Sequence, residues 1–261
     1  MSLEPGQPDS WSHLRRLTAA RIALGRSGGS LPTHAQLAFA LDHALARDAV
    51  HAPFDADVLA AELRALHAAT LVLGSAVRDR TTYLQRPDLG RKLSDHSVVR
   101  LSALDLKTPP DLVVIVSDGL SALAAQRQVA PLLGALLPML HAAGFTLAPL
   151  CVVMHARVAL MDEVGALLRT KLALMLLGER PGLGTPDSLG AYFVFGPGPG
   201  RTNADRNCVS NIRPASLPPA AAAGKLAALL IAARTLKLSG VALKETDPAL
   251  TQADAWALGS G

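Results

Sequence analysis

LVVIVS, from Leu112 to Ser117, is a short and continuous apolar run rich in β-branched residues. A run of this kind is typical of a strand buried on both faces of a sheet. Similar runs follow at residues 146–154, 172–178 and 191–195, and helical patterns over residues 120–142 and 162–169 separate the first three strands. Strands that alternate with helices indicate a parallel sheet with right-handed crossovers. The sequence therefore predicts an α/β fold, a Rossmann-like parallel sheet flanked by helices.

The residues before this run have mostly helical patterns. We expect an opening helix near residues 13–24, and a helix over residues 37–50 that begins with a capping box formed by Thr33 and Gln36. Apolar spacing predicts a further helix from about residue 57 to residue 76. Thr108-Pro109-Pro110 then marks a linker, after which the alternating pattern begins.

These features divide the chain into four predicted parts: a disordered tail (1–12), a helical N-terminal segment (13–108), an α/β domain (109–245) and a poorly specified tail (246–261). The α/β domain should end in a long helix. We expect Ser216 to cap this helix, Pro218 and Pro219 to occupy its first turn, and Gly240 to stop it.

Composition excludes several classes of function. Half of the residues are apolar and only 3% are aromatic, which suits a core of Ala, Leu and Val. The formal net charge is +4, the basic residues are dispersed, and no aromatic residues alternate with them. Nucleic-acid binding is therefore not indicated.

The sequence also predicts a cytoplasmic protein without a membrane span. The N-terminal residues lack the pattern of a signal peptide. Cys151 and Cys208 are far apart and form no C-x-x-C motif, so a reducing compartment is expected. Residues 129–154 contain no Asp, Glu, Lys or Arg, but prolines and a glycine interrupt them. A helix followed by a buried strand explains this stretch better than a membrane helix.

Polar residues follow each predicted strand. In an open parallel sheet, ligands bind beyond the carboxyl ends of the strands. Asp118, Arg157, Glu179 and the Asn207-Cys208 pair should therefore form a rim that binds a ligand. The alternative is that Asp118 and Glu179 only cap the helices that follow them.

No motif for catalysis or metal binding is found. The chain has no P-loop, and G-x-G-x-G at residues 196–200 is interrupted by prolines and favours a structural loop. H-E-x-x-H and H-x-x-x-H are absent, and neither Ser121 nor Cys208 has a base nearby in sequence. We expect no catalytic residue and no metal ligand, so residues alone predict an α/β ligand-binding domain.

Several sequence blocks resemble the small (light) subunit family of ethanolamine ammonia-lyase. They cover about residues 13–245 in the family's order, with small departures at His155 and in the loop at 196–203. The blocks are RLTAARIALGRSGGSLPT (16–33), ARDAVHAPFD (46–55), YLQRPDLGRKLS (83–94), VSDGLSALA (116–124), GERPGLGTPDSLGAY (178–192), DRNCVSNIRP (205–214) and LSGVALKE (238–245).

The resemblance implies the small subunit of an adenosylcobalamin-dependent enzyme that converts ethanolamine to acetaldehyde and ammonia. A large TIM-barrel subunit would carry the catalytic groups, and this chain would help to bind the cobalamin at the interface between the two. Family contacts to the cofactor carry over to Val158, Glu179 and Cys208. Val158 would offer an apolar or backbone contact, Glu179 would accept amide N–H bonds, and Cys208 would pack as a small side chain.

The resemblance also bears on the cobalt and on the location of the enzyme. The chain lacks the D-x-H-x-x-G motif that supplies a histidine to cobalt, so the cofactor should keep its own benzimidazole as the lower ligand. The complex would lie in the cytoplasm, either free or inside a bacterial microcompartment. The competing interpretation is a non-enzymatic α/β protein that binds a nucleotide-like ligand or has a regulatory role.

Overall fold

The computed structural model describes residues 9–18, 20–67 and 69–243, and its centre is a six-stranded sheet. The strands lie in the order β1-β3-β2-β4-β5-β6. Their bounds are β1 (Thr70–Gly74), β2 (Leu112–Ser117), β3 (Leu150–Met154), β4 (Leu172–Gly178), β5 (Leu189–Phe195) and β6 (Arg206–Ile212). The first four strands are mutually parallel, which confirms the predicted α/β class.

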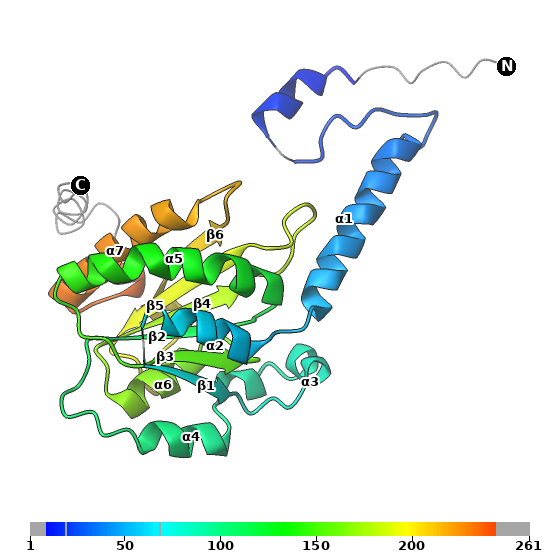
Figure 1. Cartoon of the computed structure of the whole chain (residues 1–261). Coiled ribbons are helices and arrows are strands. Elements are labelled where there is room, and N and C mark those ends of the chain that lie inside the picture. Colours follow the sequence, from blue (N-terminus) through cyan, green and yellow to red (C-terminus); the bar gives the residue numbers. More distant parts are fainter. Residues whose placement is uncertain (1–8, 19, 68, 244–261) are drawn as a thin grey trace.

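Helices cover both faces of this sheet (Figure 1). The α-helices are α1 (Thr33–His51), α2 (Ala56–Arg64), α3 (Arg80–Gln85), α4 (Asp95–Ser102), α5 (Ala122–Ala142), α6 (Leu160–Leu168) and α7 (Pro219–Leu236). The 3₁₀ helices are η1 (Ser12–Leu17), η2 (Leu89–Arg91), η3 (Asn203–Asp205) and η4 (Gly240–Ala242). Residues of α2, α5 and α7 pack on one face, and residues of α4 and α6 pack on the other.

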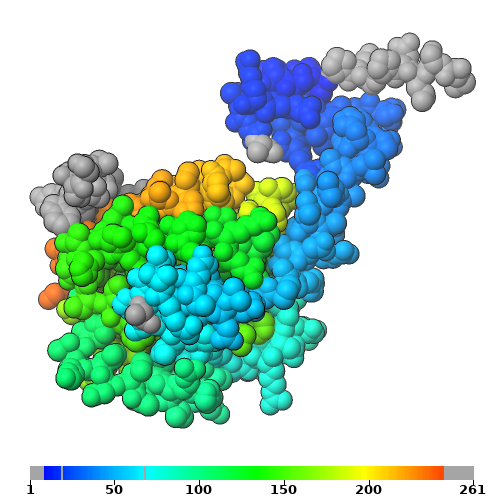
Figure 2. Space-filling view, in the orientation of Figure 1, coloured from blue at the N-terminus to red at the C-terminus, as the bar shows by residue number. Residues whose placement is uncertain are grey.

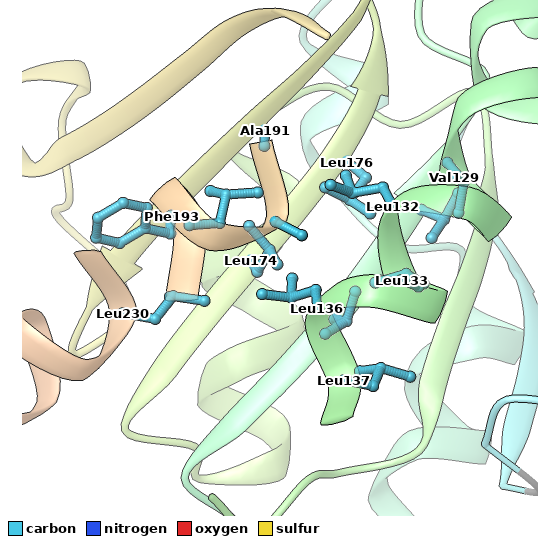
Figure 3. Packing of buried hydrophobic residues seen from close by; sticks show 14 of the residues in the cluster. Val129, Leu132, Leu133, Leu136, Leu137, Leu174, Leu176, Ala191, Phe193 and Leu230 are labelled. Atoms are coloured by element: carbon cyan, nitrogen blue, oxygen red, sulfur yellow. The ribbon is translucent and has the colours of Figure 1, made fainter. Parts of the chain in front are cut away.

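The larger core lies under α5 and α7. Figure 3 shows Leu132 and Leu136 of α5 facing Leu174 of β4, with Phe193 of β5 and Leu230 of α7 beside them. All five side chains are fully buried. The α7 helix is long and apolar enough to pass a compositional test for a membrane span, but half of it is buried inside the protein. It is therefore a core helix, as its packing against α5 requires.

The sheet differs from the prediction at β5 and β6, which run antiparallel. Only residues 179–188 connect β4 to β5, and they contain no helix. A parallel return needs a crossover of a dozen or more residues, whereas a short connection reverses the chain. Phe195 therefore lies beside Leu172 at the amino end of β4. The residues that follow β5 therefore begin at the end of the sheet opposite to Asp118, which follows the carboxyl end of β2.

The predicted helix over residues 57–76 was also wrong in its second half. The α2 helix ends at Arg64, and Thr70–Gly74 forms β1, an edge strand parallel to β3. Short apolar runs such as Thr70–Gly74 fit a strand and a buried helix equally well by periodicity alone. The sheet thus includes residues that precede the expected domain boundary at 109.

Helix ends were predicted less accurately than helices. The opening helix is only the short 3₁₀ helix η1. Thr33 is the first residue of α1 and makes no capping box, because Pro32 precedes the helix as its N-cap. Pro218 occupies the same position before α7, where Ser216 was expected, and Lys237 ends that helix in a left-handed conformation. Residues 1–8 of the predicted N-terminal tail and the whole tail at 246–261 lie outside the described residues.

The α1 helix projects from the body of the protein (Figures 1 and 2). Only Ala35 and Ala49 of its residues are buried. Its C-terminal end is held by Arg80, whose Nε donates to the carbonyl oxygen of Val50 at 2.7 Å. The helix is therefore anchored at one end, while most of its length is exposed.

Candidate functional site

Asp118 lies at the carboxyl end of β2 and is the centre of a buried polar cluster. One carboxylate oxygen accepts from Nη1 of Arg80 at 2.8 Å and lies 3.0 Å from Nδ1 of His155. The other accepts from the backbone N–H of His155 at 2.7 Å and from the hydroxyl of Ser117 at 3.0 Å. The side chain is 2% exposed. Asp118 therefore holds the turn after β3, where His155 has a left-handed backbone conformation.

The capping role considered for Asp118 belongs to Ser121. The Ser121 hydroxyl accepts from the N–H of Ala124 at the start of α5, and it donates to the carbonyl oxygen of Pro186 at 2.7 Å. Asp118 therefore does not cap α5. The prediction that it forms part of a binding rim is not supported by its burial.

Tyr83 of α3 forms the wall next to this cluster and was missed by the sequence analysis. It is fully buried, and its hydroxyl donates to the carbonyl oxygen of Ala156 at 3.2 Å. The guanidinium groups of Arg157 and Arg80 lie 4.0 Å and 4.9 Å from its ring centroid, within the range of cation–π attraction. Burial raises the pKa of Tyr83 to about 12, so its hydroxyl remains a donor at neutral pH.

Glu179 follows β4 and is partly exposed. One oxygen of its carboxylate accepts from the hydroxyl of Ser188 at 2.6 Å. The backbone N–H of Asn211 in β6 lies 3.3 Å and 3.4 Å from the two oxygens. No helix follows Glu179, so the capping alternative is wrong for this residue as well. The second oxygen retains capacity to accept a strong hydrogen bond.

Cys208 lies on the exposed edge of the sheet, close to Glu179. It is paired directly with Tyr192 across β5 and β6, which places the two side chains on the same face. Burial raises the pKa of Cys208, and the nearby Glu179 carboxylate raises it further, against a hydrogen bond with Tyr192. The thiol is therefore a weak nucleophile that remains neutral at physiological pH.

Val158 immediately precedes α6 and lies in a different environment. It packs partly on the same core face as Tyr192. It also lines a pocket of about 430 Å³. Four arginines line the same pocket: Arg91 of η2, Arg157 in the turn after β3, and Arg201 and Arg206 on either side of η3. Glu179 and Cys208 therefore both lie close to Tyr192, and Val158 lies on the same face of the sheet, just before α6.

The other two predicted rim residues differ in their roles. Asn207 alternates with Cys208 along β6 and points away from it, and its side-chain amide bonds to both backbone groups of Gly240. Arg157 lines the pocket beside Val158 while one of its Nη atoms donates to the carbonyl oxygen of Tyr83 at 2.9 Å. Asn207 is structural, and Arg157 remains a candidate for ligand contact.

The segment YLQRPDLGRKLS (83–94) is the sequence feature that could have indicated this region. It includes the end of α3 and the whole of η2, and it contributes Tyr83, Gly90 and Arg91 to this region. The carbonyl oxygen of Gly90 accepts from the N–H of Arg157 at 2.7 Å, and a Cβ at Gly90 would lie 2.8 Å from the Arg157 side chain. Within residues 9–18, 20–67 and 69–243, no group of His, Cys, Asp and Glu is arranged to hold a metal ion. The region is built for hydrogen bonding and apolar contact.

Comparisons with known proteins agree on one family. The profile of the family described as "Ethanolamine ammonia-lyase light chain (EutC)" matches residues 8–244. A protein of Azotobacter vinelandii named ethanolamine ammonia-lyase small subunit is 53% identical over 92% of this chain and 90% of its own length. Proteins of the same name from Ralstonia nicotianae and Rhodopseudomonas palustris are 53% and 52% identical over 90% and 89% of this chain, and 88% of their own lengths.

Proposed function

Because this chain belongs to the ethanolamine ammonia-lyase light chain family, we propose that it is the small subunit of an adenosylcobalamin-dependent ethanolamine ammonia-lyase. Its task is to bind the cobalamin at the interface with a catalytic large subunit. Glu179 carries this proposal, because a carboxylate at the end of a central strand retains an oxygen able to accept a further bond. The complex would act in the cytoplasm, either free or inside a microcompartment.

The residues around Glu179 fit the periphery of a corrin. Corrin amide side chains present N–H donors, and a carboxylate is a strong acceptor for them. Cys208 and Tyr192 lie beside Glu179 on an exposed stretch of sheet and offer soft and aromatic surface for contact. A bound adenosylcobalamin would supply the radical chemistry, and these residues would bind and orient it.

The α1 helix is the surface that we assign to the large subunit. Leu37, Leu41 and Leu45 recur every fourth residue, so they form one stripe along the helix. They are 65%, 60% and 47% exposed. A leucine stripe on a projecting helix is costly to leave in water, and a subunit that functions in a hetero-oligomer has a partner to cover it.

Isolated chain should show no ammonia-lyase activity and only weak binding of adenosylcobalamin. A cofactor held between two subunits loses the contacts of the absent one, and each lost hydrogen bond costs on the order of 1 kcal/mol. Ammonia release would be measured for the chain alone, the large subunit alone and the co-expressed pair. Turnover by the chain alone would overturn the assigned role, and turnover that needs both subunits supports it.

Replacement of Leu41 by Gln should weaken association with the large subunit by about 5- to 150-fold, since it removes one buried leucine contact of about 1–3 kcal/mol. Arg47→Gln is the matched control, because Arg47 is exposed on the same helix but lies away from the leucine stripe. Dissociation constants from sedimentation of the purified subunits would test this. Equal effects of the two substitutions would exclude the stripe as the interface.

A further inference from the structure

A groove between α2 and α5 lies at the amino end of the sheet. Its volume is about 290 Å³. Its lining includes Leu66, His67, Gly134, Leu137, Pro138 and His141. The two helices are in contact and lie side by side in Figure 1. The backbone N–H of Thr146, just after α5, donates to the carboxylate of Asp111, just before β2. The end of α5 is therefore at the opposite end of the sheet from Glu179, which follows the carboxyl end of β4.

The groove is apolar, and its described lining contains no Asp, Glu, Lys or Arg. Leu66 is 41% exposed at the rim. Residues 129–154, which supply the α5 side, contain no charged side chain of these four types. Burial lowers the pKa of His67, against a hydrogen bond to the backbone of Ala148 that raises it, so its imidazole is neutral at physiological pH. Exposed apolar surface of this kind is a place where another apolar group binds.

Gly134 and Pro138 leave room and a hydrogen-bond acceptor beside the groove. The nearest atom that a Cβ at Gly134 would meet lies 4.0 Å away, in the Leu66 side chain. Pro138 lies inside α5 and has no N–H to donate to the carbonyl oxygen of Gly134, four residues earlier. An indole suits such a place, because its ring is apolar and its N–H needs an acceptor when it is buried.

The chain carries an indole of its own beyond the described residues. The match to the family profile ends at residue 244, and residues 245–258 follow it as ETDPALTQADAWAL. This segment has large apolar side chains at Leu250, Trp256 and Leu258. It also has three carboxylates and no Lys or Arg: Glu245, Asp247 and Asp254.

The charge of this segment complements the rim of the groove. Arg64 is exposed at the end of α2, two residues before Leu66. No acidic residue is found in the described lining. A segment that combines an indole with carboxylates therefore matches both the apolar floor and the basic rim.

The segment is long enough to reach the groove. Leu243, its last described neighbour, follows η4, which is held beside the start of β6 by the bonds between Asn207 and Gly240. The groove lies near the start of β3, four places from β6 in the sheet, a distance of about 19 Å. The 13 residues from Lys244 to Trp256 span up to about 45 Å when extended. Attachment to the same chain also gives the indole an effective concentration on the order of 1 mM.

We propose that residues 250–258 dock in this groove of their own chain, with the Trp256 indole packed between α2 and α5. The indole N–H would donate to the carbonyl oxygen of Gly134, and Asp254 would lie near Arg64. The docked segment would cover an apolar surface at the end of the sheet opposite Glu179. It would thereby keep copies of this chain from associating through that surface.

The fluorescence of Trp256 reports on its own docking. The chain has two tryptophans, and Trp11 is 65% exposed, so Trp11→Phe leaves Trp256 as the only tryptophan at little cost to the fold. In this full-length chain we expect blue-shifted emission and weak quenching by acrylamide. Burial of one large apolar side chain should favour the docked over the undocked state by about 10-fold or more.

Gly134→Leu, made in the Trp11→Phe chain, should fill the groove and expel the indole. We expect the acrylamide quenching constant of Trp256 to rise several-fold and its emission to shift to the red. Gly224→Leu is the matched control, because it makes the same change within α7, where a Cβ would meet no atom within 4 Å. It should alter neither reading. Circular dichroism melting would verify that each variant folds. Leu66→Gln, at the exposed rim, is a second groove variant that should act in the same direction as Gly134→Leu.

Each other outcome overturns the assignment. Trp256 that is quenched as strongly as free tryptophan in the Trp11→Phe chain is not docked, and shielding that survives both groove variants places the indole elsewhere. If the shielding disappears on dilution and sedimentation shows a dimer, the occupant is a second copy of the chain. If Trp256 is exposed while both groove variants, and not Gly224→Leu, weaken association with the large subunit, the occupant is that subunit.

Discussion

Replacement of Asp118 by Ala should lower the free energy of unfolding of the chain by about 3–5 kcal/mol. The substitution leaves Arg80 partly buried without its carboxylate and removes the acceptor for the backbone N–H of His155. Breaking a buried ion pair by removal of one partner costs this much because the remaining charge is uncompensated. Urea denaturation followed by circular dichroism would measure the change.

Asp88→Ala is the matched control for this experiment. Asp88 also pairs with an arginine, Arg86, at 2.6 Å, but both side chains are more than half exposed. Exposed ion pairs contribute little, so the denaturation midpoint of Asp88→Ala should equal that of the wild type. If both aspartate variants unfolded at the wild-type midpoint, Asp118 would not hold the turns at the carboxyl edge of the sheet.

Glu179→Ala should weaken cofactor binding to the assembled enzyme by about 5- to 150-fold, which corresponds to loss of roughly 1–3 kcal/mol from a hydrogen bond to a charged group. Glu179→Gln should have a smaller effect, because the amide oxygen can still accept one bond from the corrin periphery and one from Ser188 or Asn211. Titration of each complex with cyanocobalamin would give the dissociation constants.

Turnover at saturating adenosylcobalamin separates binding from catalysis for these variants. Since Glu179 is assigned to binding, activity should largely recover when excess cofactor fills the site. Arg180→Ala is the control at the neighbouring exposed position, and it should leave both affinity and turnover unchanged. Wild-type affinity in Glu179→Ala would remove the contact, and an activity loss that excess cofactor does not repair would refute a purely binding role.

Much of the fold could be predicted because its signals are local. Leu112–Ser117 and Leu172–Gly178 are continuous apolar runs with the observed strand bounds, since a strand buried on both faces admits few polar residues. The long helix after Ser121 and the α/β class follow from the same patterning. The family is also determined by the sequence itself, because short motifs distributed over most of the chain appear in the family's order.

Other features depend on contacts between distant residues, and only the tertiary structure decided them. Thr70–Gly74 becomes a strand because β3 offers it a partner edge, and β5 reverses because the connection after Glu179 is too short for a crossover. Asp118 and Glu179 occupy equivalent positions after their strands, yet only Asp118 is enclosed by Arg80 and His155. Sequence gives each residue its chemistry and its place on a local element, whereas burial and partners depend on which segments fold against it.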